Sequence, residues 1–257
     1  MALADLAARL EAHGRPADCA WVRHISIEKV SKSDKEALVL HIEQESKSHG
    51  DRTGCIVWDC ALATIGHICF MQQLQPGGIW DVTGKRVIEL GTGTGVVGIA
   101  LALLGAASIC MTDMEDALDL TRRNVKRNFP DGGADITVVP LHWHEGWQAS
   151  HPDLASAPLD WIVGSDLVYG IDASPLASLL LELLSRNPAA QLLLAYEERP
   201  LPEHGIDYGG AFFAHLRERG CSLTPVPTAE LHPCIQTRPG VSLWRGHLRG
   251  KGESAAC

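Results

Sequence analysis

Three glycines, Gly91, Gly93 and Gly95, stand between two apolar segments of the chain. Residues 87–90 have the composition of a buried strand, and residues 96–104 have the pattern of a helix. Glycine lets the backbone approach a ligand without a Cβ clash, and the start of a helix offers free N–H groups. This order of strand, turn and helix predicts a ligand site of the nucleotide type at the carboxyl end of a parallel strand.

The spacing of the glycines bears on which nucleotide could bind. A dinucleotide fingerprint, G-x-G-x-x-G, fails when it starts at Gly91, although a shifted copy is present over residues 93–98. Glu89 lies two residues before the first glycine, where a carboxylate would repel a pyrophosphate. The pattern E-x-G-x-G-x-G resembles instead the first motif of methyltransferases that use S-adenosylmethionine (SAM), which has no phosphate.

The next predicted strand, residues 108–113, ends in another acidic residue. Asp113 lies about twenty residues after the glycines, where a carboxylate can accept hydrogen bonds from both hydroxyls of a ribose. Met114 follows it and could pack against an adenine ring. The alternative is that Asp113 only caps the helix predicted at residues 117–129.

Residues 159–169 are predicted to form the fourth strand of the parallel sheet and the mouth at its end. In a doubly wound sheet this strand lies beside the first, where the strand order reverses, and it borders the ligand crevice. Asp166 and Tyr169 would therefore face the reacting part of a bound cofactor. Alternatively, Asp166 caps the next turn and Tyr169 packs in the core.

Further short motifs follow one another in a fixed order. They are T-G-C-I-V-W-D at residues 53–59, L-H-W at 141–143, S-D-L-V-Y at 165–169 and A-Y-E-E-R at 195–199. Together with the glycine motif they resemble the protein-lysine methyltransferases typified by the valosin-containing-protein lysine methyltransferase. The resemblance covers residues 54–199, with His144 in place of the glycine that follows the tryptophan in that family.

This resemblance implies a fold and a set of site residues. The fold is α/β, a Rossmann-like seven-stranded SAM-methyltransferase sheet with helices on both faces, here with an N-terminal β-hairpin extension. The implied SAM-binding residues are Trp58, Glu89, Gly91, Thr92, Gly93, Gly95, Asp113, Met114, Trp143 and Ser165. The implied catalytic residues are Asp166 and Tyr169, and the implied lysine channel includes Tyr196, Glu197 and Arg199. In a plainer interpretation, Arg199 only pairs with a surface glutamate.

The implied reaction is an in-line displacement from a sulfonium by an amine. A lysine must first lose its proton, which at a pKa of ~10.4 costs about 4 kcal/mol near neutral pH. Burial of the amine and the nearby sulfonium charge both lower the pKa of the lysine, so a dedicated base is not required. Asp166 could orient the amine, and Tyr169 could hold it by a cation–π contact.

The 257 residues are expected to form a single domain, with residues 1–50 as an N-terminal helix and hairpin and residues 250–257 as a disordered tail. Strands are predicted at 21–27, 37–42, 87–90, 108–113, 136–143, 159–169, 191–196, 222–230 and 241–248. Helices are predicted at 1–14, from about 59 to 74, and at 96–104, 117–129, 175–185 and 209–219. Residues 43–54 are expected to be a polar loop.

The composition narrows the class of protein. The formal net charge of −9 weighs against nonspecific nucleic-acid binding. The eight cysteines include no C-x-x-C pair, which is typical of reduced thiols inside a cell. No apolar run is long enough for a membrane span, and the first twelve residues lack a signal-peptide pattern, so we expect a cytoplasmic protein.

A basic run and a pair of histidines are not expected to form functional sites. The basic run at residues 122–128 is expected to be a solvated helix face. His142 and His144 would point the same way on a strand, with Glu145 next to them. A metal site needs three or four converging ligands, and we predict none here.

The resemblance implies a protein substrate that presents a lysine, in the class of AAA-type ATPases, chaperones or translation factors. Three other functions stay open: a methyltransferase for protein histidine or a small molecule, a catalytically silent SAM-binding module, and a nicotinamide-dependent dehydrogenase. The absence of an Asn/Asp-Pro-Pro-Tyr motif at residues 165–169 argues against amide or adenine acceptors.

Overall fold

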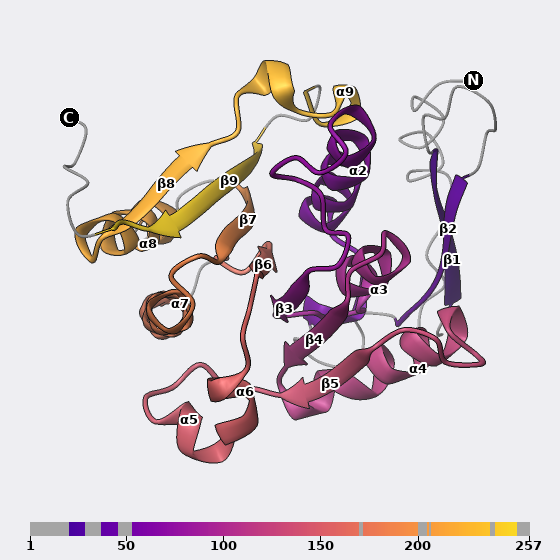
Figure 1. The fold of residues 1–257 in the computed structure, drawn as a ribbon, viewed down its shortest axis with the longest axis horizontal. Helices are drawn as coiled ribbons and strands as arrows, with labels where there is room; N and C mark the ends of the chain where they lie inside the picture. Colours follow the sequence, from indigo (N-terminus) through magenta and orange to yellow (C-terminus); the bar gives the residue numbers. More distant parts are fainter. Residues whose placement is uncertain are drawn as a thin grey trace.

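A computed structural model of the chain describes residues 21–28, 37–45, 53–169, 172–199, 205, 207–236 and 240–250. Its centre is a seven-stranded sheet in the order β5-β4-β3-β6-β7-β9-β8 (Figure 1). The strands are β3 (Arg86–Leu90), β4 (Ser108–Asp113), β5 (Ile136–Pro140), β6 (Trp161–Ser165), β7 (Gln191–Glu197), β8 (Cys221–Pro225) and β9 (Val241–Leu248). Six of the strands run in one direction, and β9 is antiparallel to both of its neighbours, β7 and β8. The strand order reverses between β3 and β6, which places a ligand crevice at their carboxyl ends.

Helices cover both faces of this sheet. The helices α2 (Asp59–Leu74), α3 (Val96–Leu103) and α4 (Leu118–Asn128) pack on one face, and α7 (Ser174–Arg186) and α8 (Tyr208–Glu218) on the other. The strands supply both cores by alternation, because successive side chains point to opposite faces. On β6, for example, Val163 belongs to the first core and Ile162 to the second.

A separate hairpin precedes the sheet, as the sequence predicts. Its strands, β1 (Trp21–Glu28) and β2 (Ala37–Gln44), are antiparallel and bury Ile25, Leu40 and Ile42 against the α2 and α3 side of the molecule. β2 extends into the predicted polar loop by two residues, because Glu43 and Gln44 still pair with β1.

The basic face of α4 is exposed, as expected, and two of its arginines also pair with the hairpin. Arg123 Nε lies 2.9 Å from a carboxylate oxygen of Glu43, and Arg127 Nη2 lies 2.8 Å from the other. The guanidinium groups hold the hairpin on α4 across more than 80 residues of chain. They lower the pKa of Glu43, although burial of that carboxyl acts in the opposite direction.

Three strands are shorter than predicted. β5 ends at Pro140 because its partner β4 ends opposite it, at Asp113. β8 ends at Pro225 and gives way to a 3-10 helix, η3 (Thr228–Glu230), since prolines cannot donate to the ladder. β6 spans only Trp161–Ser165, and the residues after it form the predicted mouth.

Short helices appear where only loops were expected. They are η1 (Thr53–Cys55), η2 (Glu115–Ala117), α5 (Trp147–Ser150), α6 (Pro152–Ser156) and α9 (Pro233–Gln236). The predicted helix at 1–14 and the predicted tail after residue 250 lie outside the described residues. In the described ranges, no helix is both long and apolar enough to cross a membrane.

Candidate active site

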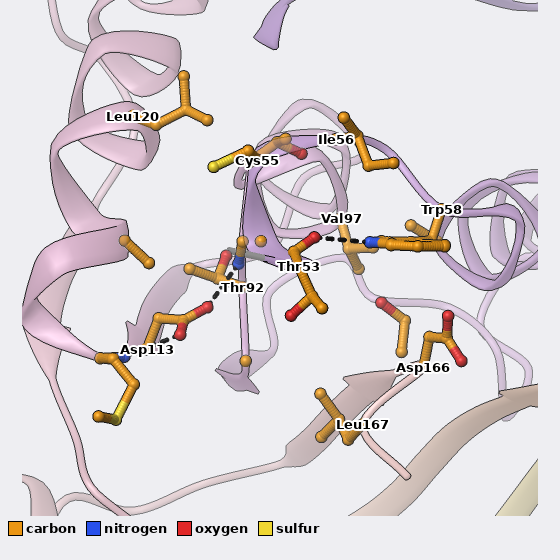
Figure 2. Close-up of a pocket in the computed structure, with 18 of the residues that line it drawn as sticks. Thr53, Cys55, Ile56, Trp58, Thr92, Val97, Asp113, Leu120, Asp166 and Leu167 are labelled. Atoms are coloured by element: carbon orange, nitrogen blue, oxygen red, sulfur yellow. Dashed lines mark hydrogen bonds between the residues drawn. The ribbon is translucent and has the colours of Figure 1, made fainter. Parts of the chain in front are cut away.

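A cavity of about 1130 Å³ lies at the carboxyl ends of β3, β4 and β6 (Figure 2). It brings together predicted residues from six separate segments of the chain. These are Trp58, Gly91, Thr92, Gly93, Asp113, Met114, Trp143, Ser165, Asp166, Tyr169 and Arg199. Glu89, Gly95, Tyr196 and Glu197 are not among its lining residues.

The turn after β3 forms one wall of the cavity and requires glycine. Gly91 and Gly93 have φ angles of 61° and 52°, which L side chains rarely adopt. A Cβ on Gly91 would lie 2.4 Å from Leu167 Cδ2, and one on Gly93 would lie 3.0 Å from the carbonyl oxygen of Gly54. The turn is therefore packed on both sides by backbone and side chains, and its open side faces the cavity.

Glu89 lies beneath this turn and not in the cavity wall. Its side chain is buried, and Oε2 accepts hydrogen bonds from Thr92 Oγ1 at 2.7 Å and from the Gly98 amide at 2.9 Å. Burial raises the pKa of the Glu89 carboxyl to about 8, and these two bonds act in the opposite direction. The glycine of the shifted fingerprint is explained here, because a Cβ on Gly98 would lie 2.7 Å from Glu89 Oε2.

Asp113 faces the cavity from the end of β4. Its Oδ2 accepts a hydrogen bond from the Gly93 amide at 2.7 Å, and its Oδ1 accepts one from the Met114 amide at 2.8 Å. Burial raises the pKa of Asp113, while these two hydrogen bonds lower it. No side chain caps η2 or α4 at its N-terminus, so Asp113 is not the cap that the alternative interpretation supposed. Met114 lies at the cavity rim with 46% of its surface exposed.

Residues 53–58, which we call the strap, form the opposite wall of the cavity. Trp58 Nε1 donates to the carbonyl oxygen of Thr53 at 2.8 Å (Figure 2). Thr53 Oγ1 lies 3.2 Å from the Tyr169 hydroxyl. The two walls meet where Gly54 packs against Gly93. The strap thus contacts both the glycine turn and the mouth of β6.

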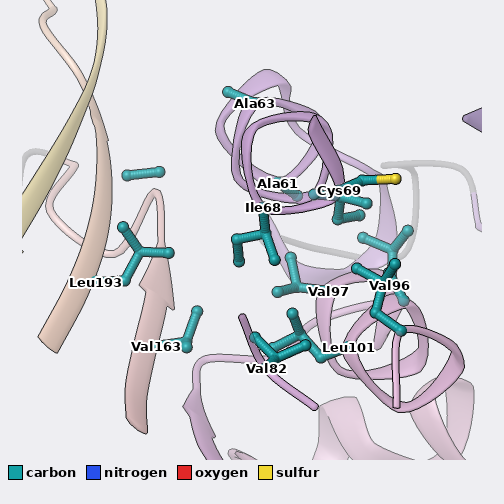
Figure 3. Close-up of a cluster of buried hydrophobic side chains, with 14 of the residues drawn as sticks. Ala61, Ala63, Ile68, Cys69, Val82, Val96, Val97, Leu101, Val163 and Leu193 are labelled. Atoms are coloured by element: carbon teal, nitrogen blue, oxygen red, sulfur yellow. The ribbon is translucent and has the colours of Figure 1, made fainter. Parts of the chain in front are cut away.

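The strap leads directly into α2, which anchors it in the core. Ala61 and Ile68 of α2 pack with Val97 and Leu101 of α3 and with Val163 of β6 (Figure 3). The position of Trp58, the residue before α2, is therefore fixed by apolar packing.

Asp166 has an unusual backbone and an incompletely paired side chain. It is the one non-glycine residue in the described ranges with a positive φ, 58°. Its Oδ2 accepts a hydrogen bond from Arg199 Nη2 at 2.6 Å, whereas its buried Oδ1 has no partner in that part of the chain. Left-handed backbone at a residue other than glycine costs free energy and clusters at functional sites. Asp166 thus lines the cavity with one of its two carboxylate oxygens unpaired.

Arg199 is also bound to Glu197, through Nη2 and Oε2 at 3.0 Å. The hydrogen bond to Asp166 raises the pKa of the guanidinium, which burial would lower. Tyr196 and Glu197 point to opposite faces of β7, because successive side chains of a strand alternate. The Tyr196 ring packs edge-on against that of Phe213, with 5.4 Å between the ring centroids. Arg199 reaches the cavity, whereas Tyr196 belongs to the second core.

Sequence reasoning missed several lining residues. They are Glu45, Thr53, Gly54, Cys55, Ile56, Val57, Ala61, Thr94, Val96, Val97, Asp116, Ala117, Asp119, Leu120, Arg123, Leu141, His142, His144, Leu167 and Pro175. The strap residues could have been included, since they directly precede Trp58. Among the residues that the structure describes, no three His, Cys, Asp or Glu side chains converge as metal ligands.

Comparisons with known proteins agree on one family. A sequence model of the family described as "Lysine methyltransferase" matches residues 34–218. Protein N-lysine methyltransferase METTL21A of Danio rerio is 37% identical over 155 residues, which are 60% of this chain and 65% of the relative. EEF1A lysine methyltransferase 3 of Mus musculus is 33% identical over 190 residues, 72% of each chain. The match thus spans less than two thirds of the first relative and more than two thirds of the second.

The fold also matches solved structures. Magnesium protoporphyrin IX methyltransferase (ChlM) from Synechocystis PCC 6803, solved with bound SAM, superposes with a TM-score of 0.50 over 74% of this chain and 79% of that chain, at 15% identity. At this identity the likeness concerns the fold alone, a Rossmann-like sheet flanked by helices.

Proposed function

The chain belongs to the lysine methyltransferase family, and from this premise we propose that it transfers a methyl group from SAM to a lysine side chain of another protein. One observation carries the proposal. A single cavity joins the glycine turn and Asp113, which suit a nucleoside, to the spare buried oxygen of Asp166, which suits an amine.

The residues present fit SAM. The turn at Gly91 and Gly93 offers backbone without side chains, and both oxygens of Asp113 keep a lone pair for ribose hydroxyls. Trp143 and Met114 would flank the adenine, and Trp58 would cover the cofactor, with the backbone of Ser165 beside it. SAM would supply an electrophilic methyl group carried on a positively charged sulfur.

The chain's own residues would align and desolvate the incoming lysine. Asp166 Oδ1 would accept a hydrogen bond from the amine, while Arg199 fixes Oδ2 and so the orientation of the carboxylate. Tyr169, next to Thr53, would bound the channel on the other side. An enclosed channel favours the neutral amine, and the proton can leave to solvent before transfer. Asp166 is thus an orienting group rather than a required base.

For the substrate we propose a protein of the translation-factor class first, because one relative is named for EEF1A. AAA-type ATPases and chaperones are further candidates. We also propose that the protein works in the cytoplasm, in keeping with its reduced-type cysteine pattern and its acidic charge.

The test is to incubate the full chain with tritiated SAM and a cell lysate, beside Asp166→Ala and the control Glu198→Ala, an exposed residue outside the cavity. We expect one labelled protein band with the wild type and with the control, weakened at least about a hundredfold in Asp166→Ala, and mapped by mass spectrometry to a lysine.

Other outcomes would contradict the proposal in distinct ways. A label on histidine or on a small molecule would show another acceptor. Binding of SAM by calorimetry without any labelled product would indicate a silent module. No binding of SAM, together with binding of a nicotinamide cofactor, would indicate a dehydrogenase.

A further inference from the structure

The outer edge of β2 is not paired with another strand but with two side chains of α4. Asn128 accepts from the His41 amide and donates to the His41 carbonyl, both at 3.0 Å. Asn124 does the same for Glu43, at 2.7 Å and 3.0 Å. Four residues of helix advance about 6 Å and two residues of strand about 6.6 Å, so side-chain amides at this spacing can imitate a neighbouring strand.

Asn124 makes one bond that Asn128 does not. Its Nδ2 also donates to the carbonyl oxygen of Thr94, in the glycine turn, at 2.9 Å. Thr121, one helical turn earlier, donates to the Gly93 carbonyl at 2.6 Å. Asn124 is fully buried, and it joins the hairpin to the turn directly.

The far end of β2 holds the strap. The Glu45 amide donates to the Cys55 carbonyl at 3.0 Å, and the side-chain oxygen of buried Gln44 accepts from the Val57 amide at 2.8 Å. Gln44 and Glu45 directly follow the residue that Asn124 binds. Hydrogen bonds therefore run from the glycine turn through Asn124 and β2 to the strap, on the opposite wall of the cavity.

We propose that Asn124 is a positioning residue that keeps the glycine turn and the strap in register, so that a ligand bound between them also stabilises the hairpin. Asn128 binds the hairpin in the same way but makes no hydrogen bond to the glycine turn. The inference rests on the proposed function, since it takes SAM or its product S-adenosylhomocysteine (SAH) as the ligand of the cavity.

The test compares Asn124→Asp with the matched control Asn128→Asp in the full chain, with SAH as the probe. Aspartate keeps the shape and the acceptor for the strand amide, but it replaces the donor by an oxygen that faces carbonyl groups. We expect the Kd for SAH in calorimetry to rise about tenfold in Asn124→Asp and less than about twofold in Asn128→Asp. Both variants should lower the melting temperature, because both lose a bond to β2.

Amide hydrogen exchange distinguishes a positioning role of Asn124 from a purely structural one. SAH should slow exchange of the His41 and Glu43 amides in the wild type and in Asn128→Asp, but not in Asn124→Asp. If Asn124→Asp does not fold, the wild type decides: unchanged exchange at these amides on binding SAH overturns the inference. Equal loss of affinity in the two variants, or none in Asn124→Asp, also overturns it. If the wild type does not bind SAH at all, the proposed function itself fails.

Discussion

Arg199 Nη2 lies 2.6 Å from Asp166 Oδ2, so one oxygen of this carboxylate is hydrogen-bonded while the other, Oδ1, has no partner in the described residues. The same nitrogen also contacts Glu197. Two carboxylates thus share one guanidinium at the end of the cavity, and this leaves a net negative charge where a cationic or partly positive amine would arrive.

Replacing Arg199 should therefore damage catalysis without damaging cofactor binding. We expect Arg199→Ala to lower kcat by about a hundredfold, because Asp166 loses its orientation and a buried charge loses its partner. Arg199→Lys should recover only part of the loss, since an ammonium lacks the planar fork. Single-turnover methylation and SAH calorimetry would separate the two effects. An SAH affinity that falls as much as kcat would contradict this assignment.

Asp113 should govern cofactor affinity instead. In Asp113→Ala we expect the Kd for SAH to rise about a hundredfold, because the ribose acceptors and the bond to the Gly93 amide are lost together. Asp131→Asn, at an exposed position outside the cavity, is the control and should bind SAH normally. Calorimetry with both variants checks this, and unchanged binding in Asp113→Ala would place the ribose elsewhere.

Gly93 should be intolerant of a side chain for two separable reasons. Gly93→Ala incurs the left-handed backbone penalty of about 1 kcal/mol and also presses its Cβ on Gly54. Gly132 has a positive φ as well, 76°, but has no atom within 4 Å of a built Cβ. Gly132→Ala should thus lose stability only, whereas Gly93→Ala should lose both stability and SAH binding. Chemical denaturation and calorimetry on the pair would show the difference, and normal SAH binding by Gly93→Ala would disprove the tight strap contact.

His67 should make the fold sensitive to acid. It is fully buried beside Trp80, and neither ring nitrogen has a partner in the described residues. Burial lowers the pKa of His67 from 6.5 to about 4. Between these values the unfolded chain binds more protons than the folded one, so stability is complete above pH 6.5 and falls as the pH drops toward 4.

The expected loss at pH 5 is about 2 kcal/mol, at 1.36 kcal/mol for each unit below the unfolded pKa. His67→Phe should reduce this loss. Some acid sensitivity would persist, because burial lowers the pKa of nearby His232 as well. Urea denaturation at pH 7 and pH 5 measures both proteins. An identical fall in the free energy of unfolding would show that His67 is not the group responsible.

The sequence predicts the parts of this site that are local in the chain. The glycine turn, Asp113 and Asp166 each stand at the end of an apolar strand, and the topology of a doubly wound sheet brings such ends together. The prediction that the strand ending at Ser165 lies beside the strand that leads into the glycine turn is confirmed, since β6 pairs with β3.

What could not be predicted depends on contacts between distant segments. The basic run of α4 is exposed as expected, but its ion pairs with the hairpin, 80 residues earlier, could not be read from the sequence. Tyr196 and Arg199 are neighbours in one motif, yet the pleat of β7 sends Tyr196 into the core. Gly98 looks like part of a dinucleotide pattern, and only the buried side chains of Glu89 and Met111 show why it is glycine.

The contact between Gly54 and Gly93 has a consequence for the order of events in turnover. We expect a molecule seated on the glycine turn to leave only when the strap moves away from Gly93, and that movement would also separate Thr53 from Tyr169. A protein substrate docked against Tyr169 would then delay departure of the spent methyl donor. If the chain transfers methyl groups as proposed, we expect each further methyl group to require a new encounter, with exchange of the donor rather than chemistry as the slow step.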